Sequence, residues 1–353
     1  MFELQLAGHK GYGAFARQDI PRGTRIFAEA PVISLPPNQK KINLLKHFEK
    51  LTPAQHVQYT ELSCNERLVQ PQLRQAIRQH LASNSQYSGQ ALNAAAEDMI
   101  KMHAIFFTNA VTMGADGCHG EGIFLQFSRI NHSCTPNVQN SYNATIRKET
   151  VHAVRDIKAG EELLSCYVPP LRPRRQRQEA LEQWSFQCHC DACDGEEAML
   201  HERRRRELFQ LGQALAIYES DNILQVATSP FQVPMNHRQA LAAAEEMVTL
   251  LKEEGLFGID LAHAYRECSK YSVKEGQMAK AVAYAKKELE IEVACVGEDT
   301  EHLGELGARS WINSLETMSE AEKLKVRMNE KRNAKEQKKS DKKAAKKACK
   351  GRH

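Results

Sequence analysis

The stretch R129-I-N-H-S-C-T-P-N137 gathers Asn131, His132 and Cys134 around one short turn, and Pro136 stiffens its exit. Asn, Ser and Pro are common turn formers, so a polar turn without chemistry is one interpretation. His and Cys also bind zinc, and His132 beside Cys134 could act as the base for a thiol nucleophile. A fourth interpretation is a backbone shaped to hold a small cofactor. The stretch alone leaves these four alternatives open.

A tight cysteine cluster, C188-H-C190-D-A-C193, is the second candidate for chemistry, and the other seven cysteines are scattered singly. We expect no secretory signal, because the N-terminus shows no basic segment followed by a long apolar core. In a reducing nuclear or cytoplasmic location such a cluster more often binds metal than forms disulfides. Three thiolates leave a four-coordinate zinc site one ligand short. A distant cysteine would complete the site; His189 is a rival ligand, although both of its neighbours are already ligands.

Composition and charge indicate a globular protein with a distinct basic tail. The chain has 353 residues, 42% hydrophobic and 26% charged, which indicates two domains or more. No apolar run reaches the roughly 18–20 residues of a membrane span, so we expect no membrane partner. Residues 331–353 hold eleven Lys and Arg against Glu336 and Asp341, a net charge of +9, which leaves −5 for the rest of a chain of formal charge +4. The tail is expected to be disordered and to contact nucleic acid or chromatin weakly, to direct nuclear import, or to aid solubility.

Hydrophobic periodicity predicts two strand-rich segments that flank a helical one. Short apolar runs between Gly and Pro predict strands in residues 1–37 and again in 108–168, where 143–148 is one expected strand. Residues 40–107 have helical spacing, and Thr52-Pro53 is a typical helix start.

The rest of the chain is predicted to be helical. A basic, then amphipathic, helix is expected over 172–187, and its arginines, like those of 203–206, are interpreted as solvated helix faces. Beyond residue 198 four helices are predicted. The last two, with small Ala281 and Ala285 for close packing, resemble one tetratricopeptide-type hairpin.

Taken in order, these pieces resemble one known family. The motifs are G11-Y-G13-A-F-A with D19-I-P-R-G23, then N131-H-S-C-T-P-N137, then G160-E-E-L-L-S-C-Y167, and finally F186-Q-C-H-C-D-A-C193. Their order and content are similar to the SET-domain protein methyltransferases, specifically the SMYD-like branch. Residues 38–108 hold only Cys64 and scattered histidines, so the MYND zinc module of that branch is absent, as in fungal-type members.

The resemblance implies an α+β fold with a pseudoknot, in which the segment 129–137 passes under the chain near 167. The implied parts are the SET core N-terminal part, a helical insert, the SET core C-terminal part, a zinc-bound post-SET segment, an all-α tetratricopeptide-like domain and the basic tail. Their expected bounds are 1–37, 38–108, 109–170, 171–197, 198–325 and 326–353, respectively.

The resemblance also implies a protein-lysine N-methyltransferase that uses S-adenosylmethionine. The cofactor contacts it implies are Lys10, Gly11, Tyr12, Gly13, Asn109, Asn131, His132, Tyr167 and Phe186, with Asn131 and His132 acting largely through main-chain bonds and Phe186 stacking on the adenine. One structural zinc ion would be held by Cys134, Cys188, Cys190 and Cys193.

The implied catalytic residue is Tyr167, whose hydroxyl would orient the amine and the methyl group at the floor of a lysine channel. The plainer alternative for Tyr167 is a strand aromatic in the core. The expected partner is a protein that presents a lysine, such as a histone tail, and the chain is expected to be a monomer. The rival function is a non-catalytic SET-fold adaptor that binds peptides or protein partners.

Overall fold

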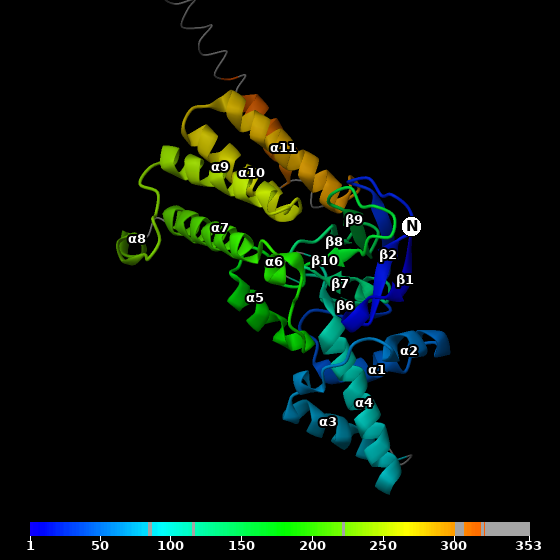
Figure 1. The fold of residues 1–353 in the computed structure, drawn as a ribbon. Coiled ribbons are helices and arrows are strands. Elements are labelled where there is room, and N and C mark those ends of the chain that lie inside the picture. Colours follow the sequence, from blue (N-terminus) through cyan, green and yellow to red (C-terminus); the bar gives the residue numbers. More distant parts are fainter. Residues whose placement is uncertain (84–86, 115–116, 221–222, 301–306, 319–320, 322–353) are drawn as a thin grey trace, which may run out of the picture.

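The computed structural model describes residues 1–83, 87–114, 117–220, 223–300, 307–318 and 321. Small sheets form the centre of the molecule, with helices of the insert on one side and a layer of long helices on the other (Figure 1). The predicted basic tail lies outside the described residues. None of the described helices has both the length and the apolar character that crossing a bilayer requires.

Four small sheets make up the central part. Their strands are β1 (Phe2–Leu6), β2 (Tyr12–Ala16), β3 (Arg25–Glu29), β4 (Ile33–Leu35), β5 (Val111–Thr112), β6 (Glu121–Ile123), β7 (Asn131–His132), β8 (Val138–Asn143), β9 (Lys148–Ala153) and β10 (Leu164–Ser165). β1 pairs with β2, β9 lies between β3 and β8, β6 lies between β4 and β5, and β7 pairs with β10. Only the β7–β10 pair is parallel among these described pairs.

The prediction of a strand over 143–148 is wrong. Only the end residues, Asn143 and Lys148, belong to strands, where they pair with each other; residues 144–147 form the turn of the β8–β9 hairpin, and Arg147 takes a left-handed φ of 55°. The strand that precedes the turn, VQNSYN, is largely polar and half-buried, so it lacks the apolar alternation on which strand prediction depends.

The insert between β4 and β5 is helical, as predicted. It holds α1 (Leu45–Phe48), α2 (Pro53–Thr60), α3 (Pro71–Ala82) and α4 (Gly89–Asn109). The start of α2 is a capping box, in which Thr52 and Gln55 each accept from the other's backbone N–H. The apolar face of α4 packs Ile105 and Phe106 against β4 and β6 of the central part and against α1 and α2.

Beyond the central strands the chain is helical, with α5 (Arg174–Leu181), α6 (Asp191–Asp194), α7 (Ala198–Glu219), α8 (Ile223–Thr228), α9 (His237–Glu253), α10 (Ile259–Lys274) and α11 (Met278–Val296). A further helix covers 308–318. α11 lies against β8 and β9, so the helical layer is joined to the central sheets (Figure 1). α10 and α11 form the expected hairpin around Gly276, with Ala281 and Ala285 fully buried. Its tetratricopeptide character stays a prediction.

Candidate functional site

Two distant motifs lie side by side in the central part. β7 pairs with β10, so that Asn131 lies beside Leu164 and His132 beside Ser165. The buried side chain of Asn137 accepts from the backbone N–H of Leu164 at 2.7 Å and donates to the carbonyl of Glu162 at 2.8 Å. The asparagine that ends the first motif therefore holds the second motif in place.

Beside these strands is a cavity of about 940 Å³. It is lined by eight of the nine residues expected to contact the cofactor, which are Lys10, Gly11, Tyr12, Asn109, Asn131, His132, Tyr167 and Phe186. The ninth, Gly13, is not part of its wall. One space, large enough for a nucleoside-sized molecule, is thus bordered by several distant segments. These are the first strands, the insert, both central motifs and the cysteine-rich region.

One end of this wall carries a charged cluster. Glu162 forms an ion pair with Lys10 and accepts from Nδ2 of Asn131 at 2.8 Å. The same Nδ2 lies 3.2 Å from the carbonyl oxygen of Tyr12. Lys10 and Asn131 line the cavity, whereas Glu162 is not part of its wall and holds both side chains from behind. Glu162 was not identified from the sequence, although it stands inside the G-E-E-L motif.

Gly13 lies directly behind this cluster. A Cβ at its position would come within 2.5 Å of Oε1 of Glu162 and 2.9 Å of Nδ2 of Asn131. A methyl group at this position would displace these side-chain ends, so glycine leaves room for the bond between Glu162 and Asn131. Gly11 has a different reason to be glycine, because its φ of 76° lies in the left-handed region.

Tyr167 and His132 are hydrogen-bonded to each other. The backbone N–H of Tyr167 donates to Nδ1 of His132 at 3.0 Å, and the Tyr167 hydroxyl donates to the carbonyl of Ile130 at 2.6 Å. Because Nδ1 accepts, the ring proton is assigned to Nε2, which lies 3.5 Å from the sulfur of Cys134. Burial lowers the pKa of His132 to about 4, so the ring is neutral. Burial also raises the pKa of Tyr167, so its hydroxyl keeps its proton.

Aromatic rings cover the Tyr167 side of the cavity. The Tyr167 ring lies 5.1 Å from that of Trp184 and 6.5 Å from that of Phe186, measured between ring centroids. Phe186 remains 37% exposed, so its face is available to a flat ligand. Asn109, the last residue of α4, lines the cavity, but its Nδ2 donates to the carbonyls of Ser63 and Ile105, both at 2.7 Å.

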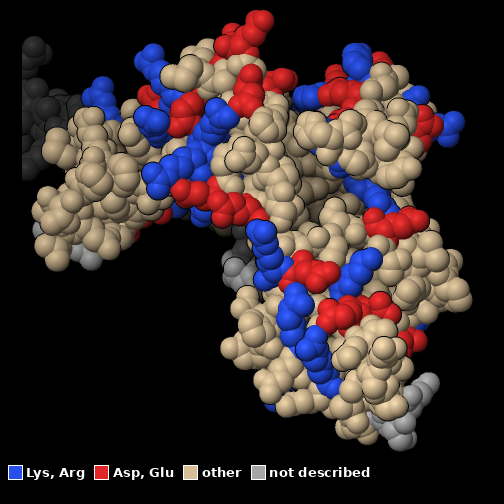
Figure 2. Space-filling view, turned by 60° about the horizontal axis from the view of Figure 1, so that its bottom comes forward, with Lys and Arg blue, Asp and Glu red and all other residues tan. Residues whose placement is uncertain are grey.

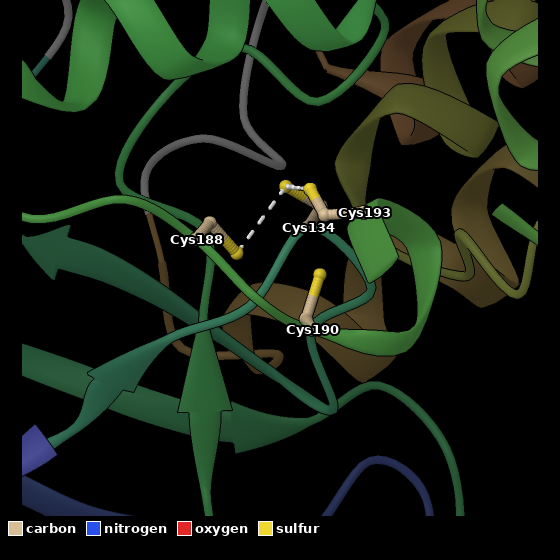
Figure 3. A group of neighbouring side chains, drawn as sticks. All are labelled: Cys134, Cys188, Cys190 and Cys193. Atoms are coloured by element: carbon tan, nitrogen blue, oxygen red, sulfur yellow. Dashed lines mark hydrogen bonds between the residues drawn. The ribbon is translucent and has the colours of Figure 1, made fainter. Parts of the chain in front are cut away.

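The four predicted metal ligands come together. The sulfurs of Cys134, Cys188, Cys190 and Cys193 all lie within 4.8 Å of one another (Figure 3). Cys134 is 3.9 Å from Cys188 and 3.7 Å from Cys193, measured between sulfurs. A tetrahedral zinc site with bonds of about 2.3 Å separates its sulfurs by about 3.8 Å, whereas a disulfide needs about 2.0 Å. The donor set and its spacing fit zinc.

Arg177 is directed at these sulfurs. Its side chain is fully buried, with Nε 3.2 Å from the sulfur of Cys134 and Nη2 3.7 Å from that of Cys193. The interpretation of this arginine group as a solvated helix face is wrong for Arg177. A guanidinium at this position would offset the negative charge that four thiolates bring to a divalent ion.

The two rival interpretations of the cluster are not supported. The Nδ1 atom of His189 is bonded to a carboxylate of Asp194, and the side chain is 53% exposed rather than turned toward the sulfurs. Cys134 is fully buried inside the sulfur cluster, so it does not present an accessible thiol beside His132.

A second buried arginine joins this region to the helical layer. Arg205 in α7 donates to the carbonyl of Cys134 at 2.9 Å and to Glu254, which follows α9, at 2.7 Å. Both side chains are inaccessible to solvent. The interpretation of 203–206 as a solvated face is therefore also wrong at Arg205.

Comparison with known proteins identifies the family. The SET domain model matches residues 11–168. Histone-lysine N-methyltransferase set5 of Schizosaccharomyces pombe is 31% identical over 284 residues, which covers 79% of this chain and 74% of that protein. The chain belongs to the SET-domain family, as its motifs predicted.

Shorter matches connect the chain to the SMYD branch. N-lysine methyltransferase SMYD2 of Homo sapiens is 39% identical over 75 residues, 21% of this chain and 17% of that protein. Protein-lysine N-methyltransferase SMYD4 of Homo sapiens is 33% identical over 107 residues, 30% of this chain and 13% of that protein. A crystal structure of the SET domain of LSMT bound to lysine and AdoHcy aligns with this chain at 12% identity and a TM-score of 0.32, and the alignment covers 90% of this chain and 87% of that one.

Proposed function

We propose that this chain is an S-adenosylmethionine-dependent protein-lysine N-methyltransferase. The observation that carries the proposal is the convergence of Lys10, Asn131, Tyr167 and Phe186 on one cavity. Two of its SET-domain relatives are named as lysine methyltransferases, which supports the same conclusion. In this proposal Lys10 and Asn131, both held by Glu162, lie at the amino-acid end of the cofactor, and Phe186 contacts its adenine ring.

S-adenosylmethionine, when bound, supplies a methyl group already activated on a sulfonium. The work left to the protein is to position the lysine amine and to exclude water. A free lysine has a pKa near 10.4, so little neutral amine exists at neutral pH. A dry, apolar channel lowers that pKa because it disfavours the charged form. Tyr167, partly buried and hydrogen-bonded to His132 and Ile130, is proposed to orient the amine.

Zinc is proposed to hold this geometry rather than to react. Cys134 comes two residues after His132, and the other three ligands closely follow Phe186. A single ion would therefore fix both walls of the cavity. This gives the 171–197 segment its proposed role as a zinc-bound post-SET segment.

Cofactor binding is the first test. Calorimetry with S-adenosylmethionine should give micromolar binding to the wild type, with one zinc per chain in the same sample. Phe186→Ala should weaken binding about threefold to tenfold, since a stacked aromatic contact contributes about 0.5–1.5 kcal/mol. Zinc without cofactor binding would contradict the enzyme and leave the adaptor as the function.

Methyl transfer is the second test. Recombinant core histones with radiolabelled cofactor are a suitable first substrate, because a histone-lysine methyltransferase is among the relatives. Tyr167→Phe should retain cofactor binding and lose most of the transfer rate. Equal rates for wild type and variant would remove Tyr167 from catalysis.

We further propose that the protein is a monomer in the nucleus or the cytoplasm.

A further inference from the structure

Asn140 lines the cavity, although no sequence motif pointed to it. Asn140 is the third residue of the polar strand β8, and this strand leads into the turn of the β8–β9 hairpin. Its Nδ2 donates to Oε1 of Glu149 in β9 at 2.8 Å, and Glu149 is fully buried. The amide nitrogen of Asn140 is therefore occupied by a partner behind the cavity wall.

Glu149 fixes the orientation of this amide. The second oxygen of Glu149, Oε2, is buried without a hydrogen-bond partner among the described residues. Oε1 can accept from Asn140 in either protonation state, because a proton on the carboxyl can reside on Oε2. Glu29 lies opposite Glu149 across the strand pair and accepts from the backbone N–H groups of Gln126 and Phe127. Burial raises the pKa of Glu149 to about 7, so both protonation states occur near neutrality.

One N–H of the Asn140 amide is held by Glu149, and the amide oxygen is the hydrogen-bond acceptor that this side chain can offer to the cavity. The wall also includes apolar residues, among them Val111, Phe127 and Ile130. Amine N–H groups lose water on entering such a space, and an unmet donor carries a free-energy cost. An oxygen fixed on the wall offers those N–H groups an acceptor.

We propose that the Asn140 amide oxygen, oriented by Glu149, is a specificity-determining contact that accepts an N–H from the substrate amine. This rests on the proposed lysine methyltransferase function. A neutral unmodified lysine has two N–H groups, a monomethylated one has one and a dimethylated one has none. The contact therefore favours substrates with at most one methyl group and limits the addition of a third.

A binding experiment tests this contact without knowledge of the natural substrate. The full chain, loaded with S-adenosylhomocysteine, is titrated by NMR with Nα-acetyl-lysine amide and with its Nε-trimethyl derivative, which has no N–H in any protonation state. The wild type should prefer the unmodified amide. Asn140→Val should reduce that preference about threefold to tenfold, the loss expected for one hydrogen bond.

Two further variants distinguish the loss of this contact from a general effect of misfolding. Ser141→Val is the control, because Ser141 neighbours Asn140 in β8 and is absent from the cavity wall; its preference should equal that of the wild type. The double variant Asn140→Val with Glu149→Met removes both partners and leaves no unpaired carboxyl. It should show the same reduced preference as Asn140→Val.

The outcomes separate this inference from the proposed function. Failure of the wild type to bind S-adenosylhomocysteine overturns both. Cofactor binding with an unchanged preference in the Asn140 variants, or with neither amide bound, overturns the Asn140 contact alone. If core histones are methylated, mass spectrometry of the products should show a shift toward higher methylation states in Asn140→Val.

Discussion

Nη2 of Arg205 donates to the main-chain carbonyl of Cys134, 2.9 Å away and 71 residues earlier in the chain. The same guanidinium pairs with the buried carboxylate of Glu254. One side chain thus connects a proposed metal ligand, α7 and the end of α9. The helical layer is joined to the central strands at the site itself, in addition to the packing of α11 on β8 and β9.

Removing Arg205 should strongly destabilise the protein. Arg205→Ala leaves Glu254 buried with weaker partners, and breaking a buried pair from one side costs about 3–5 kcal/mol. Chemical denaturation measures the free energy of unfolding. Arg206→Ala is the matched control, because Arg206 is 65% exposed and its pair with Glu202 should contribute less than about 1 kcal/mol. Equal losses in the two variants would contradict the role given to Arg205.

Arg177→Met should weaken zinc binding by about tenfold to a hundredfold, the usual effect of losing a group that supports metal ligands. Methionine retains most of the length of the side chain but donates no N–H to the sulfurs of Cys134 and Cys193. Competition with a chromophoric chelator measures the affinity. Arg175→Met, on the same helix at an 89% exposed position, should bind zinc like the wild type. An unchanged affinity in Arg177→Met would show that the N–H to sulfur contacts contribute nothing.

Gly13→Ala should impair cofactor binding by about tenfold or more, because the added methyl group displaces Glu162 from Asn131 and disturbs the ion pair with Lys10. Calorimetry with S-adenosylmethionine measures the loss. Gly212→Ala in α7 is the control, since its nearest atom would be 3.9 Å away. That control should bind normally and gain up to about 1 kcal/mol of stability from helix propensity. Wild-type affinity in Gly13→Ala would refute the steric argument.

Glu149 should give the protein a specific dependence of stability on pH. Its carboxyl is neutral at acid pH in both states, but burial raises the pKa in the folded state to about 7, compared with about 4.3 in an unfolded chain. The folded state holds the proton more tightly, so stability should fall as pH rises from about 4 to 7 and then level off.

Glu149→Gln should remove this component. The quantity to compare is the unfolding free energy of the variant minus that of the wild type. This difference should be more positive at pH 8 than at pH 5, by on the order of 1–3 kcal/mol. Glu29 faces the same carboxyl across the strands and stays in both proteins, so the difference reports on Glu149. A difference between the two proteins that is the same at pH 5 and pH 8 would contradict the raised pKa.

The sequence was sufficient to predict which motif residues meet. Asn131, His132, Tyr167 and Phe186 line one cavity, and Cys134 joins the three cysteines of the later cluster. This worked because the motifs occur in an order that resembles the SET-domain family, whose model matches residues 11–168. The role of the His132 ring, which ties Tyr167 to Cys134, could not be predicted, since the expectation for His132 concerned its main chain.

The buried charges were not predictable from the sequence. Arg177 and Arg205 each stand in runs of arginine, and such runs normally mark solvated helix faces. Only the packing of distant segments decides which member of a run turns inward. The pair of Asn140 and Glu149 likewise depends on the register of the β8–β9 hairpin, whose first strand was not predicted. On the face shown in Figure 2, basic and acidic side chains are interspersed among the other residues.

The sulfur cluster also has a consequence for the order in which the chain is made. Synthesis produces the whole SET-matched segment, 11–168, before any of residues 184–193 exists. At that moment Cys134 has none of its three sulfur neighbours, and Tyr167 has neither of the rings of Trp184 and Phe186 beside it. The cavity is therefore completed only after a further two dozen residues have been added, and a fragment that stops at the end of the family match lacks the part of the wall that Trp184 and Phe186 supply.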